Sequence, residues 1–517
     1  MLTRRSFVRL LGLGGGGLWL RHVVGVRGAL WARAQQAVDV DITLVARSEN
    51  IQLLPSGPAT TVWHYAATLN AGDAGALEPL PNTYLGPVLR AKKGERWRVR
   101  FENSLPGAEE TTVHWHGLHV PDDMDGHPRF AIAPGESYQY EFPILNRAGP
   151  YWFHPHPHGR TGPQVYMGLA GLLLVSDDEE AAAGLPSGAY DLPLVIQDRT
   201  FDANNQLVYS ADINGFLGDT ILVNGRPNVT LSVEPRSYRL RFYNGSNARI
   251  YKLAWSDGTP LSVIATDGGL LEYAVERNYV TLAPAERVEV LVNFGRWAGQ
   301  TITLRSLSFS GATPGFSNNT TLPNGAQFDV MSFQVAPAQP AAGTGAHNVY
   351  LPLVQRSGKL STIERYVLDD AVNASNPRTF YLYFTRGEWT QNGRTFELTA
   401  TAPDEDVRLD TLELWEFANE VPPGTNGTNN TAHPMHIHGP LFQVVERIPP
   451  ADATQRANWE TVKDGYVDDG WKDTVLLMPG ERVRLLIRFE QYTGLYLYHC
   501  HLLEHEDRGM MRNYRVQ

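Results

Sequence analysis

The sequence predicts an all-β protein built from three copies of one β-sandwich module. Three observations support this fold class. Short segments alternate apolar and polar residues, 48 glycines and 34 prolines mark frequent turns, and two sequence patterns each occur three times. Alternation indicates strands with one buried face, because side chains along a strand point to opposite faces. Many short strands separated by turns are typical of β-sandwiches.

The first repeated pattern is a proline turn followed by an alternating strand. Its three copies lie at residues 133–142, 283–294 and 478–489. The second pattern is an alternating strand that ends at an asparagine, and its copies lie at residues 94–103, 236–244 and 410–419. Copies separated by roughly 150 to 195 residues indicate three domains of one fold. We therefore expect domains at residues 39–180, 188–336 and 345–517.

The start of the chain indicates an export signal. Arg4 and Arg5 precede an apolar, glycine-rich run that ends at Leu20. Twin arginines before such a run are typical of the bacterial twin-arginine pathway, and a basic disordered tail is the alternative. The run is short for a membrane span. We expect residues 1–36 to be the signal and the mature protein to be periplasmic or extracellular, with no membrane span.

The composition limits the class of partner. Hydrophobic residues make up 42% of the chain and charged residues 19%, which is ordinary for a globular protein. The net charge of −11 argues against a nucleic-acid partner. The single cysteine cannot form an internal disulfide, so stability must come from burial in several cores. We expect a monomer whose partners are small molecules.

The single cysteine lies in the most informative segment of the chain. Cys500 stands between His499 and His501, and His505 and Met510 follow. Thiolate, imidazole and a weak axial thioether are the ligands of blue copper sites. The residues before Cys500 predict a strand, so its side chain points to one face and both neighbouring imidazoles point to the other. One copper can then bind at the thiolate while the histidines serve metals on the opposite face.

Histidines also recur in pairs separated by one residue. Sixteen histidines in 517 residues predict about 0.5 such pairs by chance. Five pairs are present: His114/His116, His154/His156, His156/His158, His436/His438 and His499/His501. A lone pair on a strand is more often a partly buried polar pair than a metal site. Several pairs together with the Cys500 segment predict a metal cluster.

These motifs resemble those of the multicopper oxidases, the family of laccases, bilirubin oxidases and bacterial cuprous oxidases. The resemblance covers nearly the whole chain after the expected signal, and all four copper motifs of the family are intact. It implies cupredoxin-like Greek-key β-sandwich domains and four copper ions, namely one type 1, one type 2 and two type 3 ions. The motifs fall in the first and third expected domains. The trinuclear cluster is therefore expected between those domains, with the second domain as a spacer.

Carried over by position, the resemblance assigns each ligand. The type 1 copper would take His433, Cys500, His505 and, as the axial ligand, Met510. The type 2 copper would take His114 and His436. The type 3 pair would take His116, His154, His156, His438, His499 and His501.

One of these assignments has an alternative. His156 and His158 could replace His154 and His156 as the second pair. The segment 149–153 matches the family's lead-in to the first of these pairs, which favours His154 and His156. His119 and His158 would then be solvated or lie behind the ligands.

Two carboxylates resemble the proton-relay acids of the family. Asp125 follows the first motif and Glu506 lies in the fourth. A carboxyl group close to reacting oxygen can act as a general acid. The alternatives are a turn residue for Asp125 and a solvated loop residue for Glu506. Asp473 could orient a ligating histidine from behind.

The resemblance implies one-electron oxidation of a donor coupled to four-electron reduction of dioxygen to water. Cuprous oxidases of the family carry a methionine-rich insert in the third domain, whereas this chain has eight methionines and none between Met331 and Met435. We therefore expect a laccase-like enzyme for phenols or aromatic amines. A cuprous oxidase acting on Cu(I) and a non-catalytic copper-binding protein are the alternatives. The polar loop at residues 419–431 is expected to border the donor site.

Overall fold

The computed structural model describes residues 37–80, 83–210, 212–312, 320–338 and 358–517. Residues Val40–Gln517 form one compact unit. The expected export signal at residues 1–36 lies outside the described residues and stays a prediction. Within the described ranges, no helix is both long enough and apolar enough to cross a membrane.

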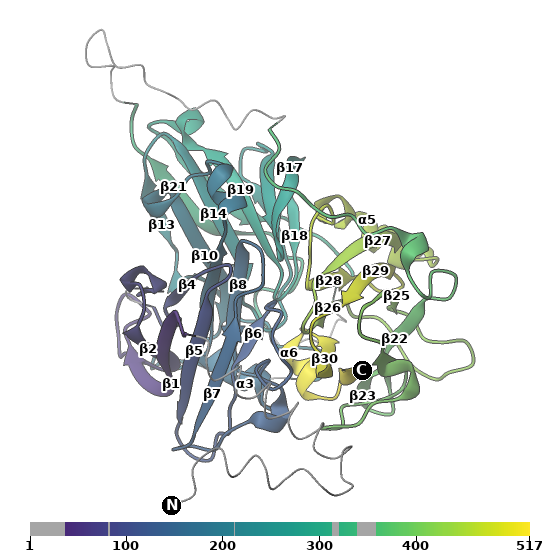
Figure 1. The fold of residues 1–517 in the computed structure, drawn as a ribbon. Helices are drawn as coiled ribbons and strands as arrows, with labels where there is room; N and C mark the ends of the chain where they lie inside the picture. Colours follow the sequence, from purple (N-terminus) through teal and green to yellow (C-terminus); the bar gives the residue numbers. More distant parts are fainter. Residues whose placement is uncertain (1–36, 81–82, 211, 313–319, 339–357) are drawn as a thin grey trace, which may run out of the picture. The chain divides into compact units, whose positions relative to one another are not determined.

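The strands of the described residues form six sheets, which fall into three pairs along the chain (Figure 1). In the first sheet pair, one sheet has the order β2-β1-β5-β7 and the other has the order β3-β4-β9-β8-β6. Side chains from both sheets, among them Trp97, Phe101 and Trp115, form a shared apolar core. The strands are β1 (Val40–Ile51), β2 (Thr60–Ala71), β3 (Leu77–Glu78), β4 (Val88–Lys92), β5 (Arg96–Ser104), β6 (His114–His116), β7 (Ser137–Pro143), β8 (Gly149–His154) and β9 (Gly171–Ser176).

The second sheet pair has the orders β12-β11-β10-β14-β19-β16-β17 and β13-β21-β20-β15-β18. Its core includes Phe242, Trp255 and Phe333. The strands are β10 (Asp191–Arg199), β11 (Thr220–Val223), β12 (Arg226–Pro227), β13 (Thr230–Val233), β14 (Ser237–Asn244), β15 (Tyr251–Trp255), β16 (Leu261–Thr266), β17 (Gly269–Arg277), β18 (Val280–Leu282), β19 (Arg287–Asn293), β20 (Thr301–Ser306) and β21 (Phe328–Val335).

The third sheet pair has the orders β23-β22-β25-β29-β27 and β24-β31-β30-β26-β28. Its core includes Trp415, Tyr498 and Cys500. The strands are β22 (Arg378–Thr385), β23 (Glu388–Gln391), β24 (Asp406–Val407), β25 (Thr411–Ala418), β26 (His433–Ile437), β27 (Phe442–Ile448), β28 (Thr474–Leu477), β29 (Arg482–Phe489), β30 (Gly494–Cys500) and β31 (Met511–Val516).

The two repeated sequence patterns occupy equivalent strands in the three sheet pairs. They form the antiparallel neighbours β5 and β7, β14 and β19, and β25 and β29. In each case a further strand, β1, β10 or β22, lies parallel to the first member. This shared topology confirms the predicted all-β fold of three sandwiches. The expected boundaries near residues 180–188 and 336–345 are not marked by separate compact units and stay predictions.

Helices are short and lie between strands. They are α3 (Thr161–Met167), α4 (Asp178–Ala182), α5 (Ala453–Glu460) and α6 (Leu503–Asp507). Short 3-10 helices lie at Ala74–Ala76, Pro128–Phe130, Gly188–Tyr190, Phe294–Trp297, Leu368–Asp370, Pro403–Glu405 and Lys463–Gly465. α6 follows β30 closely, and Asp507 at its end accepts hydrogen bonds from the first two backbone N–H groups of α3. This contact joins the first sheet pair to the third.

Four strands position the paired histidines. In the first sheet pair, β6 and β8 run antiparallel with His114 opposite His154. In the third, β26 and β30 run antiparallel with His436 opposite His499. The pairing brings motifs that are far apart in the sequence to the same level of each sheet.

Candidate metal centre

Three side chains of the third sheet pair converge on one point, and we call them the Cys500 group. His433 begins β26, Cys500 ends β30 and His505 lies in α6. Cys500 Sγ is 3.4 Å from His433 Nδ1 and 3.7 Å from His505 Nδ1, and the two nitrogens are 3.2 Å apart. All three side chains are buried. Two imidazoles and a thiolate at these separations fit around one copper ion.

Met510 lies beside the Cys500 group. Its backbone N–H donates to the carbonyl of His505 at 2.8 Å, and its carbonyl accepts from the Cys500 N–H at 3.0 Å. Its side chain is buried in the same apolar cluster as Cys500. The structure therefore brings the predicted axial residue next to the three other predicted ligands.

Trp389, which the sequence analysis did not single out, packs on the Cys500 group. Its ring stacks on His505 with 4.3 Å between ring centroids, and it meets His433 edge-on at 5.0 Å. Its Nε1–H donates to the carbonyl of Ile213 at 2.6 Å. Both imidazoles are 0% exposed, and their Nε2 atoms are buried without a hydrogen-bond partner. A donor molecule therefore has no open path to either imidazole edge in this conformation.

The other eight predicted ligands form a second group, the histidine cluster. Four come from the first sheet pair and four from the third: His114, His116, His154, His156, His436, His438, His499 and His501. All are buried. His114 Nε2 and His436 Nε2 lie 3.3 Å apart and form a pair across the two sheet pairs.

The remaining six histidines form two triplets. His154 Nε2 lies 3.3 Å from His116 Nδ1 and 3.4 Å from His501 Nε2. In the other triplet, His499 Nε2 lies 3.2 Å from His156 Nε2 and 3.1 Å from His438 Nε2. Each triplet combines residues from both sheet pairs. One pair and two triplets match the division that the family resemblance implied for one type 2 and two type 3 ions.

The hydrogen bonds behind the rings place a proton on the outer nitrogen, Nδ1, of His114 and of His436. His114 donates from Nδ1 to the carbonyl of Asp125 at 2.7 Å, and His436 donates from Nδ1 to the carbonyl of Asp473 at 2.8 Å. In neutral rings, the two Nε2 atoms are then lone-pair acceptors. Lone pairs 3.3 Å apart repel each other unless a cation lies between them. The donor set therefore fits a metal ion, and imidazole is a common ligand of copper.

The histidines left unassigned lie outside the cluster. His158 is exposed and its ring stands 4.9 Å from that of Phe396. His119 lies against the backbone, with Nε2 3.1 Å from the carbonyl of Glu490. The structure thus brings His154 and His156 together with the other ligands and leaves His158 out.

Asp125 and Glu506 both lie behind the histidine cluster. Asp125 Oδ2 accepts from His438 Nδ1 at 2.6 Å, and burial raises the pKa of this carboxyl while His114 opposes the rise. Glu506 Oε2 is 3.2 Å from His499 Nδ1 and Oε1 is 3.5 Å from His156 Nδ1. Glu506 is 1% exposed, so it is not a solvated loop residue. Both carboxyl groups face the outer nitrogens of the rings.

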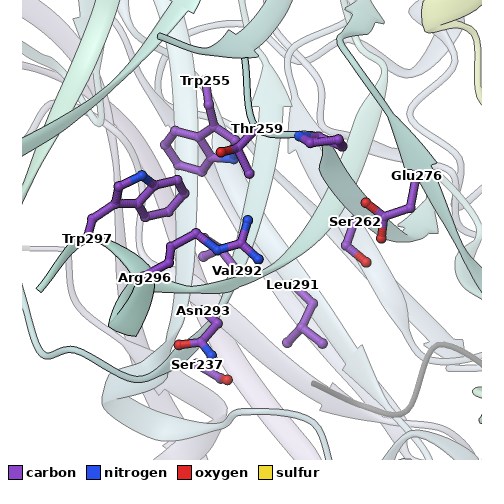
Figure 2. Close-up of a pocket in the computed structure, with 11 residues that line it drawn as sticks. Ser237, Trp255, Thr259, Ser262, Glu276, Leu291, Val292, Asn293, Arg296 and Trp297 are labelled. Atoms are coloured by element: carbon purple, nitrogen blue, oxygen red, sulfur yellow. The ribbon is translucent and has the colours of Figure 1, made fainter. Parts of the chain in front are cut away.

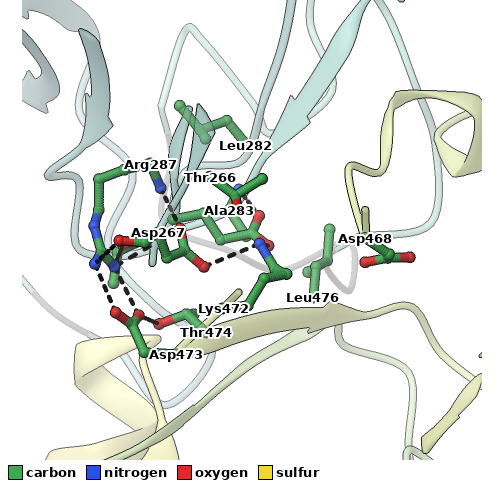
Figure 3. A network of polar contacts seen from close by, with 12 residues as sticks. Thr266, Asp267, Leu282, Ala283, Arg287, Asp468, Lys472, Asp473, Thr474 and Leu476 are labelled. Atoms are coloured by element: carbon green, nitrogen blue, oxygen red, sulfur yellow. Dashed lines mark hydrogen bonds and ion pairs between the residues drawn. The ribbon is translucent and has the colours of Figure 1, made fainter. Parts of the chain in front are cut away.

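Asp473 occupies a third position behind the cluster. Its Oδ1 accepts from His116 Nε2 at 3.1 Å, and its backbone carbonyl accepts from His436. The contact with a ligating histidine that the sequence suggested is therefore present. Its carboxylate pairs with Arg287 of β19, in the second sheet pair (Figure 3).

Burial controls the protonation of both groups. It lowers the pKa of His433 to about 3. Burial, followed by neighbouring imidazoles, also lowers the pKa values of His116, His154, His156, His436, His438, His501 and His505. Burial raises the pKa of the Cys500 thiol well above its usual value. These imidazoles are therefore neutral near pH 7, and metal binding at Cys500 would release a proton.

Two hollows lie apart from these groups. A cavity of about 50 Å³ lies in the second sheet pair and has room for only a few water molecules. Its lining includes Trp255, Arg296 and Trp297 (Figure 2). An open hollow of about 600 Å³ is lined by residues of the first and third sheet pairs, including Tyr366 and Trp471. No residue of the Cys500 group or the histidine cluster lines either hollow.

Comparison with known proteins assigns the family. Residues 58–180 and 371–517 each match a family model described as multicopper oxidase. A laccase from Bacillus stratosphericus is 31% identical, and the alignment covers 88% of this chain and 90% of the laccase. The chain belongs to the multicopper oxidase family.

The fold of this multicopper oxidase agrees with that assignment. The crystal structure of McoA from the hyperthermophile Aquifex aeolicus has a TM-score of 0.74 and 32% identity to it, covering 93% of this chain and 99% of McoA. The likeness confirms cupredoxin-like sandwiches, and the family makes the protein a copper-binding oxidoreductase. The cell division protein FtsP of Xenorhabdus nematophila is also 32% identical, over 83% of this chain and 82% of FtsP. Family membership alone therefore does not assign a donor.

Proposed function

We propose that this multicopper oxidase couples the one-electron oxidation of phenolic or aromatic-amine donors to the four-electron reduction of dioxygen to two waters. One observation carries the proposal: three consecutive residues at the end of β30, His499, Cys500 and His501, join the two metal groups. Cys500 belongs to the Cys500 group, and its neighbours His499 and His501 belong to the two triplets. The covalent path between the groups is therefore a thiolate, a short stretch of backbone and an imidazole.

The proposed ligand set follows the geometry of the two groups. His433, Cys500 and His505 would hold the type 1 ion, together with Met510. His114 and His436 would hold the type 2 ion, and the two triplets would hold the type 3 pair. When bound, these four copper ions would supply the redox chemistry between the donor and dioxygen.

Protons for water formation need nearby acids, and Asp125 and Glu506 are the proposed sources. Asp125 lies 2.6 Å from Nδ1 of His438, and Glu506 lies 3.2 Å from Nδ1 of His499. Glu506 is buried, and its other carboxylate oxygen lies 3.5 Å from His156 Nδ1. A carboxyl group at this position could act as a general acid toward the cluster.

The proposed donor class rests on composition and on the surroundings of the Cys500 group. The chain lacks methionines between Met331 and Met435, so it has no soft-ligand relay for Cu(I) in that segment. Trp389 supplies an aromatic surface beside His505 instead. We also propose that Arg4 and Arg5 direct export by the twin-arginine pathway, and that the mature enzyme works as a monomer outside the cytoplasm.

The deciding experiment is dioxygen uptake by the copper-loaded protein, run in parallel with a phenolic donor and with Cu(I). Fast uptake with the phenol and slow uptake with Cu(I) is the expected result. The reverse order would replace the proposed donor by Cu(I) and make the protein a cuprous oxidase without a methionine-rich insert.

A Cys500→Ser variant separates catalysis from copper storage. The substitution removes the thiolate and leaves the histidine cluster intact, so an oxidase should lose essentially all donor oxidation while keeping most of its other copper. A wild-type protein that binds copper but shows no uptake with either donor would contradict the proposal.

A further inference from the structure

We infer that Arg287 is a positioning residue of the trinuclear copper site, so that the second sheet pair takes part in that site and does more than space its neighbours. The inference rests on the proposed function. Arg287 begins β19 and is fully buried. It contacts none of the predicted ligands directly and acts through Asp473.

Every N–H donor of the Arg287 guanidinium is used. Nε donates to the carbonyl of Pro150 at 2.8 Å. One terminal nitrogen donates to the carbonyl of Ala285 at 3.0 Å and to Asp473 Oδ1 at 2.7 Å. The other donates to the carbonyl of Asp267 at 3.1 Å and to Asp473 Oδ2 at 2.6 Å. A lysine ammonium has three donors on one atom and cannot reproduce this planar arrangement.

Asp473, held by Arg287, in turn orients His116 and His436, which are proposed ligands of different copper ions. Its Oδ1 accepts from His116 Nε2, which leaves His116 Nδ1 facing its triplet. Its backbone carbonyl accepts from His436 Nδ1, which leaves His436 Nε2 facing His114. Acceptors behind ligating histidines fix the tautomer and the ring orientation. Displacement of Asp473 would therefore disturb a type 3 ligand and a type 2 ligand together.

Further charged side chains surround the ion pair of Arg287 and Asp473. Lys472 Nζ lies 3.0 Å from Asp267 Oδ2 and 3.1 Å from Glu286 Oε1, and Asp267 also accepts from the Arg287 backbone N–H (Figure 3). The network thus holds three carboxylates and two cationic side chains, all buried. Its carboxylate nearest the histidines is Asp473. The network therefore reaches the histidine cluster through Asp473 and holds that side chain from the second sheet pair.

A glycine of the first sheet pair leaves space for the ion pair between Arg287 and Asp473. Gly117 follows the ligand His116 and has a φ of +87°. A Cβ atom at Gly117 would clash with Asp473 Oδ2 and lie 3.1 Å from an Arg287 terminal nitrogen. Arg287 itself bonds to Pro150 in β8, the strand that carries His154. All three sheet pairs therefore meet at this one guanidinium.

The test compares full-length, copper-loaded variants. Arg287→Lys keeps the charge but loses the planar donors, and Asp473→Asn keeps the size of the side chain but loses the carboxylate. Arg249→Lys is the matched control, because Arg249 is equally buried in the second sheet pair and its guanidinium donates to Asp198 at 2.8 Å and to the carbonyls of Gly218 and Leu322, none of which bonds to a predicted copper ligand. The readouts are the blue absorption of the Cys500 thiolate, the electron paramagnetic resonance signal of the type 2 ion and copper retention against a chelator.

We expect Arg287→Lys and Asp473→Asn to keep the blue absorption while their type 2 copper is retained about 10- to 100-fold more weakly. Arg249→Lys should keep both signals. Equal loss of both signals in the Arg287 variant, or no change in either, would overturn the inference. Asp473→Asn decides the case if Arg287→Lys does not accumulate as folded protein. A wild-type chain without a type 2 signal would overturn the proposed function as well. If the wild type shows both copper signals and the variants show them unchanged, only this inference is overturned.

Discussion

Glu506 lies behind His156 and His499, two histidines of one triplet. Its carboxyl group is one of the two proposed proton sources. Glu506→Gln keeps the volume of the side chain and removes the acid. We expect dioxygen reduction to slow by about 100-fold, because a positioned acid typically contributes this much or more. Anaerobic reduction of the blue Cys500 site by the donor should proceed at the wild-type rate, and stopped-flow absorption measures both steps.

The matched control is Glu504→Gln, two residues away in α6. Glu504 is also buried, but one of its oxygens already accepts from Tyr209 at 2.8 Å and from Asn247 at 2.9 Å. Its substitution should leave dioxygen reduction nearly unchanged. Equal slowing in the two variants would show that any buried acid in this helix has the same effect and would remove Glu506 from its proposed role.

Trp389 should limit the size of donor that reaches the Cys500 group. Trp389→Phe keeps a ring to stack on His505 but loses the hydrogen bond to Ile213, so the covering segment is held less firmly. We expect a lower KM for a bulky phenol and no change in the blue absorption. Ferrocyanide, which exchanges electrons without entering a pocket, should show an unchanged KM. Steady-state kinetics with both donors check this prediction.

Trp297→Phe provides the control for the tryptophan substitution. Trp297 is buried in the second sheet pair, and its Nε1–H donates to Asp257 at 2.8 Å. The variant therefore loses a comparable hydrogen bond in a different sheet pair from the Cys500 group. If it lowers the phenol KM as much as Trp389→Phe does, the effect reflects general loosening of the fold.

Sequence motifs predicted the ligands but neither Trp389 nor Arg287. The ligands stand one or a few residues apart on strands, so the alternation of side chains predicted which of them share a face. Arg287 meets Asp473 across 186 residues, and Trp389 meets Ile213 across 176. No local spacing reports such contacts, because they depend on how separate sheet pairs pack. Asp473 was suggested only as a residue that could orient a ligating histidine, and its two partners lie 37 and 357 residues away in the sequence.

At the scale of elements, the loop at residues 419–431 lies against the hairpin that carries Trp389. Thr428 pairs with Phe384 in β22, and Thr385 donates to the carbonyl of Asn426 at 2.8 Å. Trp389 follows in β23. The loop is therefore in position to border the donor path that the sequence predicted for it.

Shortening this loop by two residues near Gly424 should change the KM for a phenolic donor more than the KM for dioxygen. The loop contacts the hairpin beside the Cys500 group, whereas the histidine cluster is held by β6, β8, β26 and β30. A deletion of equal length in the partly exposed loop at residues 183–187 serves as the control. An unchanged donor KM in the first variant would count against a donor site here.

The repeated patterns predicted the equivalent strands of the three sandwiches because each pattern carries its own turn and alternation. They did not predict the sheets that hold the histidines. β6 has only three residues, and His114, Trp115 and His116 are all buried, so no apolar–polar alternation marks it. A strand buried on both faces looks like any short apolar segment, and its position follows from pairing with β8.

At the scale of the whole molecule, the buried histidines should make the metal-free protein sensitive to acid. Their folded pKa values lie below the value of about 6.5 that unfolded histidine has, so the unfolded chain binds more protons below that pH. The contribution to stability is complete above about pH 6.5 and is lost as the pH falls toward the folded values, about 3 for His433.

Each such histidine can lower the free energy of unfolding by up to about 1.4 kcal/mol per pH unit in this range. Urea unfolding of the metal-free protein at about pH 7.5 and at about pH 5.5 measures the effect. We expect a clear loss of stability at the lower pH. Equal stability at both values would mean that the imidazoles are already protonated or exposed in the metal-free fold.

The order of the ligands along the chain bears on protein synthesis. The residues from His499 to His505 contribute to the Cys500 group and to both triplets, and they are the last ligands besides Met510 to leave the ribosome. A product of premature termination or proteolysis within the third sandwich, before Cys500, keeps the strands of the first two sandwiches and the four cluster histidines of the first. It nevertheless lacks part of the thiolate group and part of each triplet. Under the proposed function, a chain that ends before Cys500 therefore cannot take electrons from a donor, and turnover can begin only after these ligands have been synthesised.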